Sequence, residues 1–435
     1  MSKQLFFRGT LLLTGAGLLT RLMGFFYRIF LSRTIGAEGL GIYQLLMPMQ
    51  TMVMAFSTVG IQTAISRLSA SRFALEHQEE ARDFFLLGTF LSCILSCSGA
   101  LFCFFYADFI ACELLKEPAA KDLIRLLAFS FPLSSLHTCI NSFCFARKNA
   151  GLPAFIQLLE QLVRIGSTWL LYLIFLSEGR TAAPIIAVFG TLAGEMASAL
   201  VSLFYMGSDF HKHHYRPCPF SQIGTRFGEI GKTALPLTVN RVLLTVLGSI
   251  EVVLIPQMLR RYGLEPSDAL SIYGIFTGMA LPLILFPSTI TNSASAMLMP
   301  SIAELQAKGF SKRIRYVVTR ASSLCVVLGT GCCVFFLLFG KFLGLWLFHS
   351  ETAGIFIRTL SFICPFLYLN TTLSGILNGL GKSGTCLIHN SAGLIIRIAS
   401  VAVLVPQMGI RGYFYGILIS ECLLSLLHLK ALYFA

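Results

Sequence analysis

Long apolar segments recur from one end of this 435-residue chain to the other. A helix needs about 20 apolar residues to cross roughly 30 Å of hydrocarbon, and only short polar stretches separate segments of that length here. Hydrophobic residues make up 55% of the sequence and charged residues 12%, whereas about a quarter of a soluble chain is charged. The sequence therefore predicts an all-α membrane protein and leaves no room for a soluble domain.

The spacing of these segments predicts about 12 transmembrane helices. We expect them at residues 9–32, 41–66, 84–107, 123–146, 153–177, 182–206, 233–257, 270–298, 317–340, 354–380, 384–405 and 411–434.

Lys and Arg are concentrated in the connecting segments on the side of the two chain ends. By the positive-inside rule, both termini then face the cytoplasm, and we expect a multi-pass protein of a bacterial plasma membrane. The net charge of +13 follows from this topology and from attraction to anionic lipid head groups, so we expect no nucleic-acid partner.

Several motifs occur twice along the chain. Arg-Ile-Gly-Ser at residues 164–167 returns as Arg-Ile-Ala-Ser at 397–400, and Gly-Thr-Leu-Ala-Gly-Glu at 190–195 returns as Gly-Ile-Leu-Ile-Ser-Glu at 416–421. Repeated halves with an even number of helices insert in the same orientation and are typical of transporters. We therefore expect a monomer with two parallel six-helix repeats around a central cavity.

The repeat also predicts how the chain is divided. We expect an N-terminal six-helix bundle at residues 1–206, a cytoplasmic linker at 207–232 and a C-terminal six-helix bundle at 233–435.

Several charged residues fall inside the predicted helices, where one charge costs at least about 2.5 kcal/mol. Arg21 and Arg28 are seven residues apart and therefore share one face of their helix. Arginine presents planar, paired donors to phosphate oxygens, so a wet cavity lined by arginines would bind a diphosphate. The predicted substrate-binding residues are Arg21, Arg28, Glu160, Arg164, Arg241 and Arg397.

Some of these charges have an alternative explanation. Glu160 and Arg164 are four residues apart in the favourable order, and they could neutralise each other without a ligand. Glu195 and Glu421 end the two copies of the second motif, and a packing role or an arginine partner would account for them.

No catalytic residues are predicted, because the longest polar stretch, residues 207–232, is too short for a catalytic domain. We therefore expect that the chain is not an enzyme and holds no cofactor and no metal site, apart from a coupling ion of unknown identity.

Three segments are similar to a known family. They are residues 153–164, residues 272–283 followed by Phe286-Pro287-Ser288, and residues 33–37 followed by Gly41-Ile42-Tyr43. Nearly the whole chain resembles the stage V sporulation protein B group of the polysaccharide-transporter family. That family belongs to the multidrug/oligosaccharidyl-lipid/polysaccharide flippase superfamily and is related to lipid II flippases.

The resemblance implies a flippase or exporter that moves an undecaprenyl-diphosphate-linked glycan precursor by alternating access, for spore cortex or cell wall. It also implies that Arg21 and Arg28 contact the diphosphate in the central cavity. Lipid II flippases have an ion site between helices 7 and 11, and Glu251 and Asn390 match those places as ion-coupling residues. The expected partners are a lipid-linked anionic glycan and membrane lipids.

Two other functions remain open at this point. A cation-coupled multidrug antiporter of the same fold would be expected to have an acidic, aromatic-lined cavity, and the interior arginines disfavour it. A membrane glycan-processing enzyme would need a substantial catalytic loop with paired carboxylates.

Overall fold

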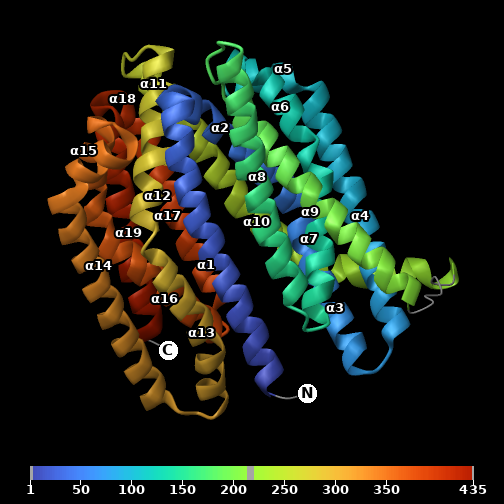
Figure 1. The fold of residues 1–435 in the computed structure, drawn as a ribbon. Helices are drawn as coiled ribbons and strands as arrows, with labels where there is room; N and C mark the ends of the chain where they lie inside the picture. The colour runs from blue at the N-terminus through green and yellow to red at the C-terminus, as the bar shows by residue number, and fades with distance from the viewer. Residues whose placement is uncertain (1–2, 213–219, 434–435) are drawn as a thin grey trace. The chain divides into compact units, whose positions relative to one another are not determined.

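A computed structural model describes residues 3–212 and 220–433, and every regular element in those ranges is a helix (Figure 1). The elements before residue 213 are α1 (Lys3–Thr34), α2 (Gly36–Met54), η1 (Ala55–Val59), α3 (Gly60–Ala74), α4 (Gln78–Phe105), α5 (Ala107–Phe109), η2 (Ile110–Leu114), η3 (Pro118–Ala120), α6 (Lys121–Ala128), α7 (Ser130–Ala146), α8 (Gly151–Ser177) and α9 (Ile185–Lys212).

The remaining elements begin at residue 220. They are α10 (Phe220–Arg261), α11 (Pro266–Gly274), η4 (Ile275–Ala280), α12 (Leu281–Leu285), α13 (Ser288–Ala307), α14 (Ser311–Phe348), α15 (Glu351–Leu360), η5 (Ser361–Ile363), α16 (Cys364–Gly379), α17 (Ser383–Val403), α18 (Val405–Met408) and α19 (Ile410–Tyr433).

The predicted membrane spans all overlap helices of the structure. Within the described residues, nine helices are long and apolar enough to cross a membrane, or ten when the bent pair at 118–128 and 130–146 counts as one span. The two predicted spans outside this set fall on α1, which carries arginines along its length, and on α2 with α3, which η1 separates. The prediction of a many-helix membrane protein is confirmed.

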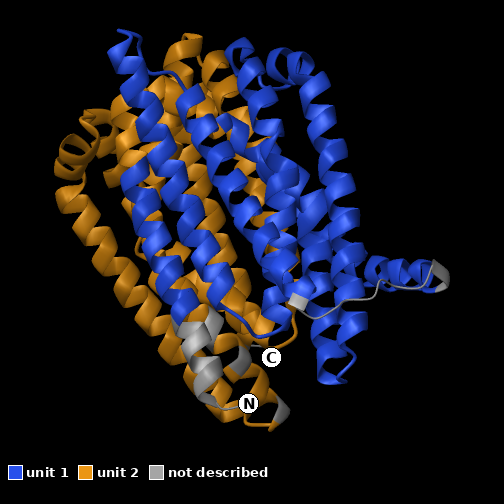
Figure 2. Ribbon diagram, turned by 45° about the vertical axis from the view of Figure 1, so that its right-hand side comes forward, with its two compact units in different colours: residues 1–27, 45–249 blue, residues 28–44, 250–435 orange. Residues whose placement is uncertain are grey.

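The chain forms two compact units (Figure 2). Unit 1 comprises residues 1–27 and 45–249, and unit 2 comprises residues 28–44 and 250–435. The bounds of these units differ from those of the predicted bundles at 1–206 and 233–435. The division into two bundles concerns the membrane topology, and it stays a prediction. Part of the predicted linker lies outside the described residues, and its part from Phe220 onward is helical and continues into the membrane helix α10.

The core of unit 1 forms where α3, α4 and α7 meet. Phe85 of α4 stacks on Phe143 of α7 with ring centroids 4.5 Å apart. Ser92 on α4 shares a hydrogen bond of 2.7 Å with Ser135 on α7 and donates one of 2.8 Å to the Ser57 carbonyl. The Ser57 carbonyl belongs to η1, and a π-helical turn leaves backbone carbonyls free for such side-chain donors.

In unit 2, α2 packs very closely against α11. A Cβ atom on Gly274 would lie 2.1 Å from the Ala37 carbonyl oxygen and 2.6 Å from the Gly41 nitrogen. Only a residue without a side chain fits at this contact. The two segments that cross here belong to the motifs that carry the family resemblance, so those motifs include residues that fix a helix crossing.

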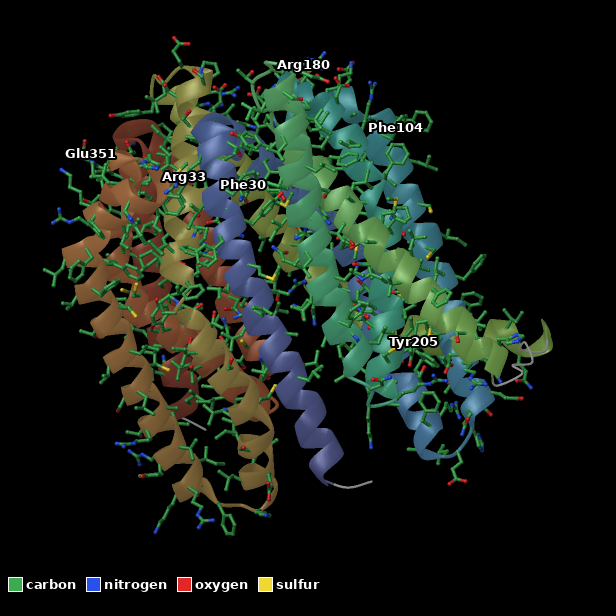
Figure 3. The ribbon with its side chains drawn as sticks, in the orientation of Figure 1. Phe30, Arg33, Phe104, Arg180, Tyr205 and Glu351 are labelled. Atoms are coloured by element: carbon green, nitrogen blue, oxygen red, sulfur yellow. The ribbon has the colours of Figure 1, made fainter. Side chains whose placement is uncertain are left out.

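Arg33, near the end of α1, holds another junction of unit 2 (Figure 3). Its Nε donates to the Leu347 carbonyl at 2.9 Å and its Nη2 to the Trp346 carbonyl at 2.8 Å. Both carbonyls belong to the last turn of α14, where carbonyl groups lack partners within the helix and attract a cation.

The α2–α11 crossing gives a direct test of the fold. Replacing Gly274 with Ala forces the two backbones apart, and we expect a loss of about 1–3 kcal/mol of stability. The matched control is Gly248→Ala on α10, where a Cβ atom meets nothing within 4 Å. Thermal unfolding of the purified protein in detergent measures the stability of both variants. Equal unfolding midpoints for the two variants would refute the close crossing of α2 and α11.

Candidate functional site

A buried charge cluster lies inside unit 2, at Arg397 of α17. Its Nε lies 2.9 Å from Glu251 Oε1, and its Nη2 donates to Glu251 Oε2 at 3.0 Å. The Tyr413 hydroxyl donates a further hydrogen bond of 2.6 Å to Glu251 Oε1. The Glu251 carboxylate therefore has an arginine ion pair and a tyrosine hydroxyl as partners, an arrangement that stabilises a buried charge.

A second carboxylate, Glu421 of α19, belongs to the same cluster. Its Oε1 lies 3.9 Å from Arg397 Nη1, and its Oε2 accepts a hydrogen bond of 2.7 Å from Asn370 Nδ2. The Asn370 amide is itself oriented, because Ser425 Oγ donates to its Oδ1 at 2.8 Å. Both carboxylates are almost fully buried, so Arg397 is their shared counter-charge.

Unit 1 contains a comparable cluster, built on α7, α8 and α9. Arg164 of α8 pairs with Glu160, one helical turn earlier. On the adjacent helices, His137 Nε2 of α7 lies 2.7 Å from Glu195 Oε2 of α9. One ring nitrogen of His137 and one carboxylate oxygen each of Glu160 and Glu195 all lie within 4.8 Å of one another. The two pairs therefore form one group.

Small residues bring α8 and α9 close enough to form this cluster. A Cβ atom on Gly194 would lie 2.9 Å from the Glu160 carbonyl oxygen, and one on Gly190 would lie 2.0 Å from Thr168 Oγ1. Gln157, on the same face of α8 as Glu160 and Arg164, donates from Nε2 to Thr20 Oγ1 of α1 at 3.2 Å. This face of α8 therefore contacts both α1 and α9 within unit 1.

Three arginines of the predicted site have different surroundings. Arg21 and Arg28 on α1 and Arg241 on α10 have exposed side chains, and none of them forms an ion pair with any residue in the described ranges. An uncompensated guanidinium on an apolar helix is expensive in hydrocarbon, so each needs water or an anionic partner.

The predicted site residues therefore fall into two groups. Glu160, Arg164 and Arg397 are engaged in ion pairs within their own units. Of the two residues predicted to couple an ion, Glu251 bonds to Arg397 and Tyr413, whereas Asn390 Nδ2 contacts Cys386 Sγ at 3.4 Å. Their roles toward substrate and ion stay predictions.

His137, Asn370 and Tyr413 were missed from the sequence. One signal was present for the first two, because His137 and Asn370 are separated by the same 233 residues as Arg164 and Arg397. Tyr413 gave no such signal, since an aromatic residue in an apolar helix is ordinary.

Comparison with known proteins gives a consistent assignment of fold. A family model described as polysaccharide biosynthesis protein matches residues 6–306. The chain is 28% identical to stage V sporulation protein B of Bacillus subtilis (strain 168), over 98% of this chain and 83% of that protein.

Two solved structures extend the comparison. The lipid II flippase MurJ, in an inward closed conformation, has a TM-score of 0.76 at 12% identity and covers 97% of this chain and 87% of its own. An inward-facing multidrug resistance MATE family transporter of the MOP superfamily has a TM-score of 0.72 at 16% identity and covers 96% of this chain and 94% of its own. These likenesses confirm the predicted transporter fold, and the relatives named by activity are transporters, not enzymes.

The unit 2 cluster makes a strong prediction about stability. Arg397→Met leaves Glu251 and Glu421 buried without a counter-charge, and we expect a loss of about 3–5 kcal/mol. The double variant Arg397→Met with Glu251→Gln should recover part of that loss, because it removes one of the stranded charges.

Arg411→Met is the matched control, since Arg411 is exposed on α19 and forms no ion pair with the residues described. Thermal unfolding in detergent should show a small effect for this variant. If Arg397→Met unfolds at the same temperature as Arg411→Met, then Arg397 is not the counter-charge that stabilises Glu251 and Glu421.

Proposed function

The chain belongs to the polysaccharide biosynthesis protein family, and we propose that it moves a lipid-linked, anionic glycan precursor across a bacterial plasma membrane. The proposed cargo is an undecaprenyl-diphosphate-linked sugar or oligosaccharide for cell wall or spore cortex. Relatives with a flippase or sporulation role in their names support this class of cargo.

The observation that carries the proposal is a set of exposed guanidinium groups that lack an ion-pair partner. Arg21, Arg28 and Arg241 are exposed and have no ion-pair partner among the described residues. The buried carboxylates at the two clusters, by contrast, each have a basic or amide partner. Membrane helices that expose unpaired cations suit an anionic cargo better than a cationic drug, which favours the flippase over the multidrug antiporter.

A diphosphate fits this kind of site chemically. The guanidinium group donates two parallel hydrogen bonds to phosphate oxygens and keeps its charge at any physiological pH. The prenyl tail can stay in the lipid, because it has no polar group that must leave hydrocarbon. In this proposal the arginines bind the head group only, and the sugar determines specificity through contacts that we do not assign.

Arg164 and Arg397 have a different part in the proposal. Each is held by a carboxylate, so it can bind a phosphate only by exchanging one anion for another. Such an exchange would leave Glu160 or Glu251 in need of a cation, which links cargo binding to ion binding. We propose alternating access by a monomer with both termini in the cytoplasm, and we keep Glu251 and Asn390 as the ion-coupling residues in unit 2.

The test is transport by the purified protein in vesicles that contain labelled undecaprenyl-diphosphate sugar. Arg21→Ala removes one charge-assisted contact worth about 1.5–3 kcal/mol, so we expect a reduction in transbilayer movement of about tenfold or more. Arg21→Lys keeps the charge without the paired donors and should be intermediate.

Arg411→Ala is the control for surface charge, and its transport rate should equal that of the wild type. A rate unaffected by Arg21→Ala would contradict the binding role of that arginine. Export of a cationic dye by the same vesicles, without movement of the labelled lipid, would favour the antiporter instead.

A further inference from the structure

The buried clusters of the two units are copies of each other in three positions. His137, Arg164 and Glu195 on α7, α8 and α9 correspond to Asn370, Arg397 and Glu421 on α16, α17 and α19. In both units the side chain on the first helix is hydrogen-bonded to the glutamate at the same distance of 2.7 Å. The copies differ in the chemistry of that first residue.

The second carboxylate of each cluster has a different origin. Glu160 comes from the same helix as its partner Arg164, whereas Glu251 comes from α10 and reaches Arg397 from another element. Each cluster nevertheless contains two carboxylates and one guanidinium group. With all these groups ionised, each would hold one negative charge too many.

An excess negative charge is costly in a buried cluster. Glu195 and Glu421 are 4% and 6% exposed, and a buried carboxylate without a counter-charge is strongly unfavourable. In unit 1, His137 can remove the excess by accepting a proton, because an imidazolium ion next to Glu195 completes a second ion pair. Asn370 cannot do this, since an amide does not ionise.

The surroundings of His137 fit that role. Its side chain is buried, and its Nδ1 has no hydrogen-bond partner among the residues described, while Nε2 is bonded to Glu195. The charged groups that act on the ring are Glu195 of α9 and Glu160 and Arg164 of α8. A proton on the imidazole brings this group of two anions and one cation to neutrality.

We propose that His137 and Glu195, with the Glu160–Arg164 pair beside them, form an exchangeable proton-binding site inside unit 1. A hydronium ion from the solvent supplies the proton: its O–H bond breaks, one N–H bond forms on the imidazole, a water molecule is left, and the cluster becomes neutral. The proton-binding step stands on the cluster alone. Its use to drive cargo movement rests on the proposed function.

A metal ion is the other cation that this group of ligands could hold. Zinc in a tetrahedral site has bonds of about 2.0–2.2 Å, which sets neighbouring ligand atoms roughly 3.4 Å apart. His137 Nε2 and Glu195 Oε2 are 2.7 Å apart, a distance that suits a shared proton. The guanidinium group of Arg164 also repels a divalent metal ion more strongly than a single proton. The geometry therefore favours the proton.

The first experiment detects the proton without any cargo. Nitrogen-15 NMR of histidine-labelled, full-length protein in nanodiscs distinguishes an imidazolium ion from a neutral ring. At about pH 7 we expect one buried imidazolium signal that His137→Asn removes. Glu195→Gln, which keeps the shape but removes the counter-charge, should convert that signal to a neutral ring.

His349→Asn is the matched control, because His349 is exposed and has a left-handed backbone conformation that asparagine tolerates. It should remove a different signal and leave the buried one unchanged. A neutral His137 in the wild type, or an imidazolium that persists in Glu195→Gln, would overturn the proposal. A change of the same signal on adding sodium or zinc ions at constant pH would overturn the choice of proton.

The second experiment tests the use of the proton. An imposed pH gradient should change the rate of lipid-linked sugar movement in wild-type and His349→Asn vesicles but not in Glu195→Gln vesicles. If the imidazolium is present and no lipid-linked sugar moves in any vesicle, the proposed function fails and the proton site stands. If movement occurs and responds to the gradient equally in all variants, the coupling role of the site is refuted.

Discussion

The cost of charge in hydrocarbon governs this molecule more than any other interaction. An ionised side chain on a membrane helix must find an opposite charge, water or a ligand. The described structure uses the first solution for Arg164 and Arg397, which are paired with glutamates inside their own units. Arg21, Arg28 and Arg241 have no such partner in the described ranges, so water or a ligand must stabilise their charge. This difference between arginines with an ion-pair partner and arginines without one supports the proposed function.

The internal repeat explains why the compensated clusters look alike and where they differ. Equivalent helices bring an arginine, a glutamate and a polar partner together in each unit, with glycine or serine at the close helix contacts. Gly194 packs on the Glu160 backbone, and its counterpart Ser420 donates to the Gly393 carbonyl at 3.0 Å. The two units therefore share this framework, and they differ in that His137 of unit 1 can accept a proton where Asn370 of unit 2 cannot.

Much of this could be predicted from the sequence, because apolar length and repeated motifs are local properties. The helical segments, the duplicated arginines and glutamates, and the Glu160–Arg164 pair all follow from spacing. The partners of Arg397 do not, since Glu251 and Tyr413 come from distant helices. The helix from Phe220 was also missed, because its glycines and charges resemble a loop. In the structure that segment forms two ion pairs, Glu229 with Arg72 at 3.2 Å and Arg226 with Asp83, which hold it against α3 and α4.

The most direct measurement of the central claim is equilibrium binding of two lipids that differ only in charge. One is an undecaprenyl-diphosphate sugar, and the other carries the same sugar on uncharged undecaprenol. The account predicts that the protein in nanodiscs binds the diphosphate lipid at least about tenfold more tightly, as expected for one or more charge-assisted contacts. It also predicts that this preference disappears when Arg21, Arg28 and Arg241 are replaced together by glutamine. Equal binding of the two lipids by the wild-type protein would contradict it.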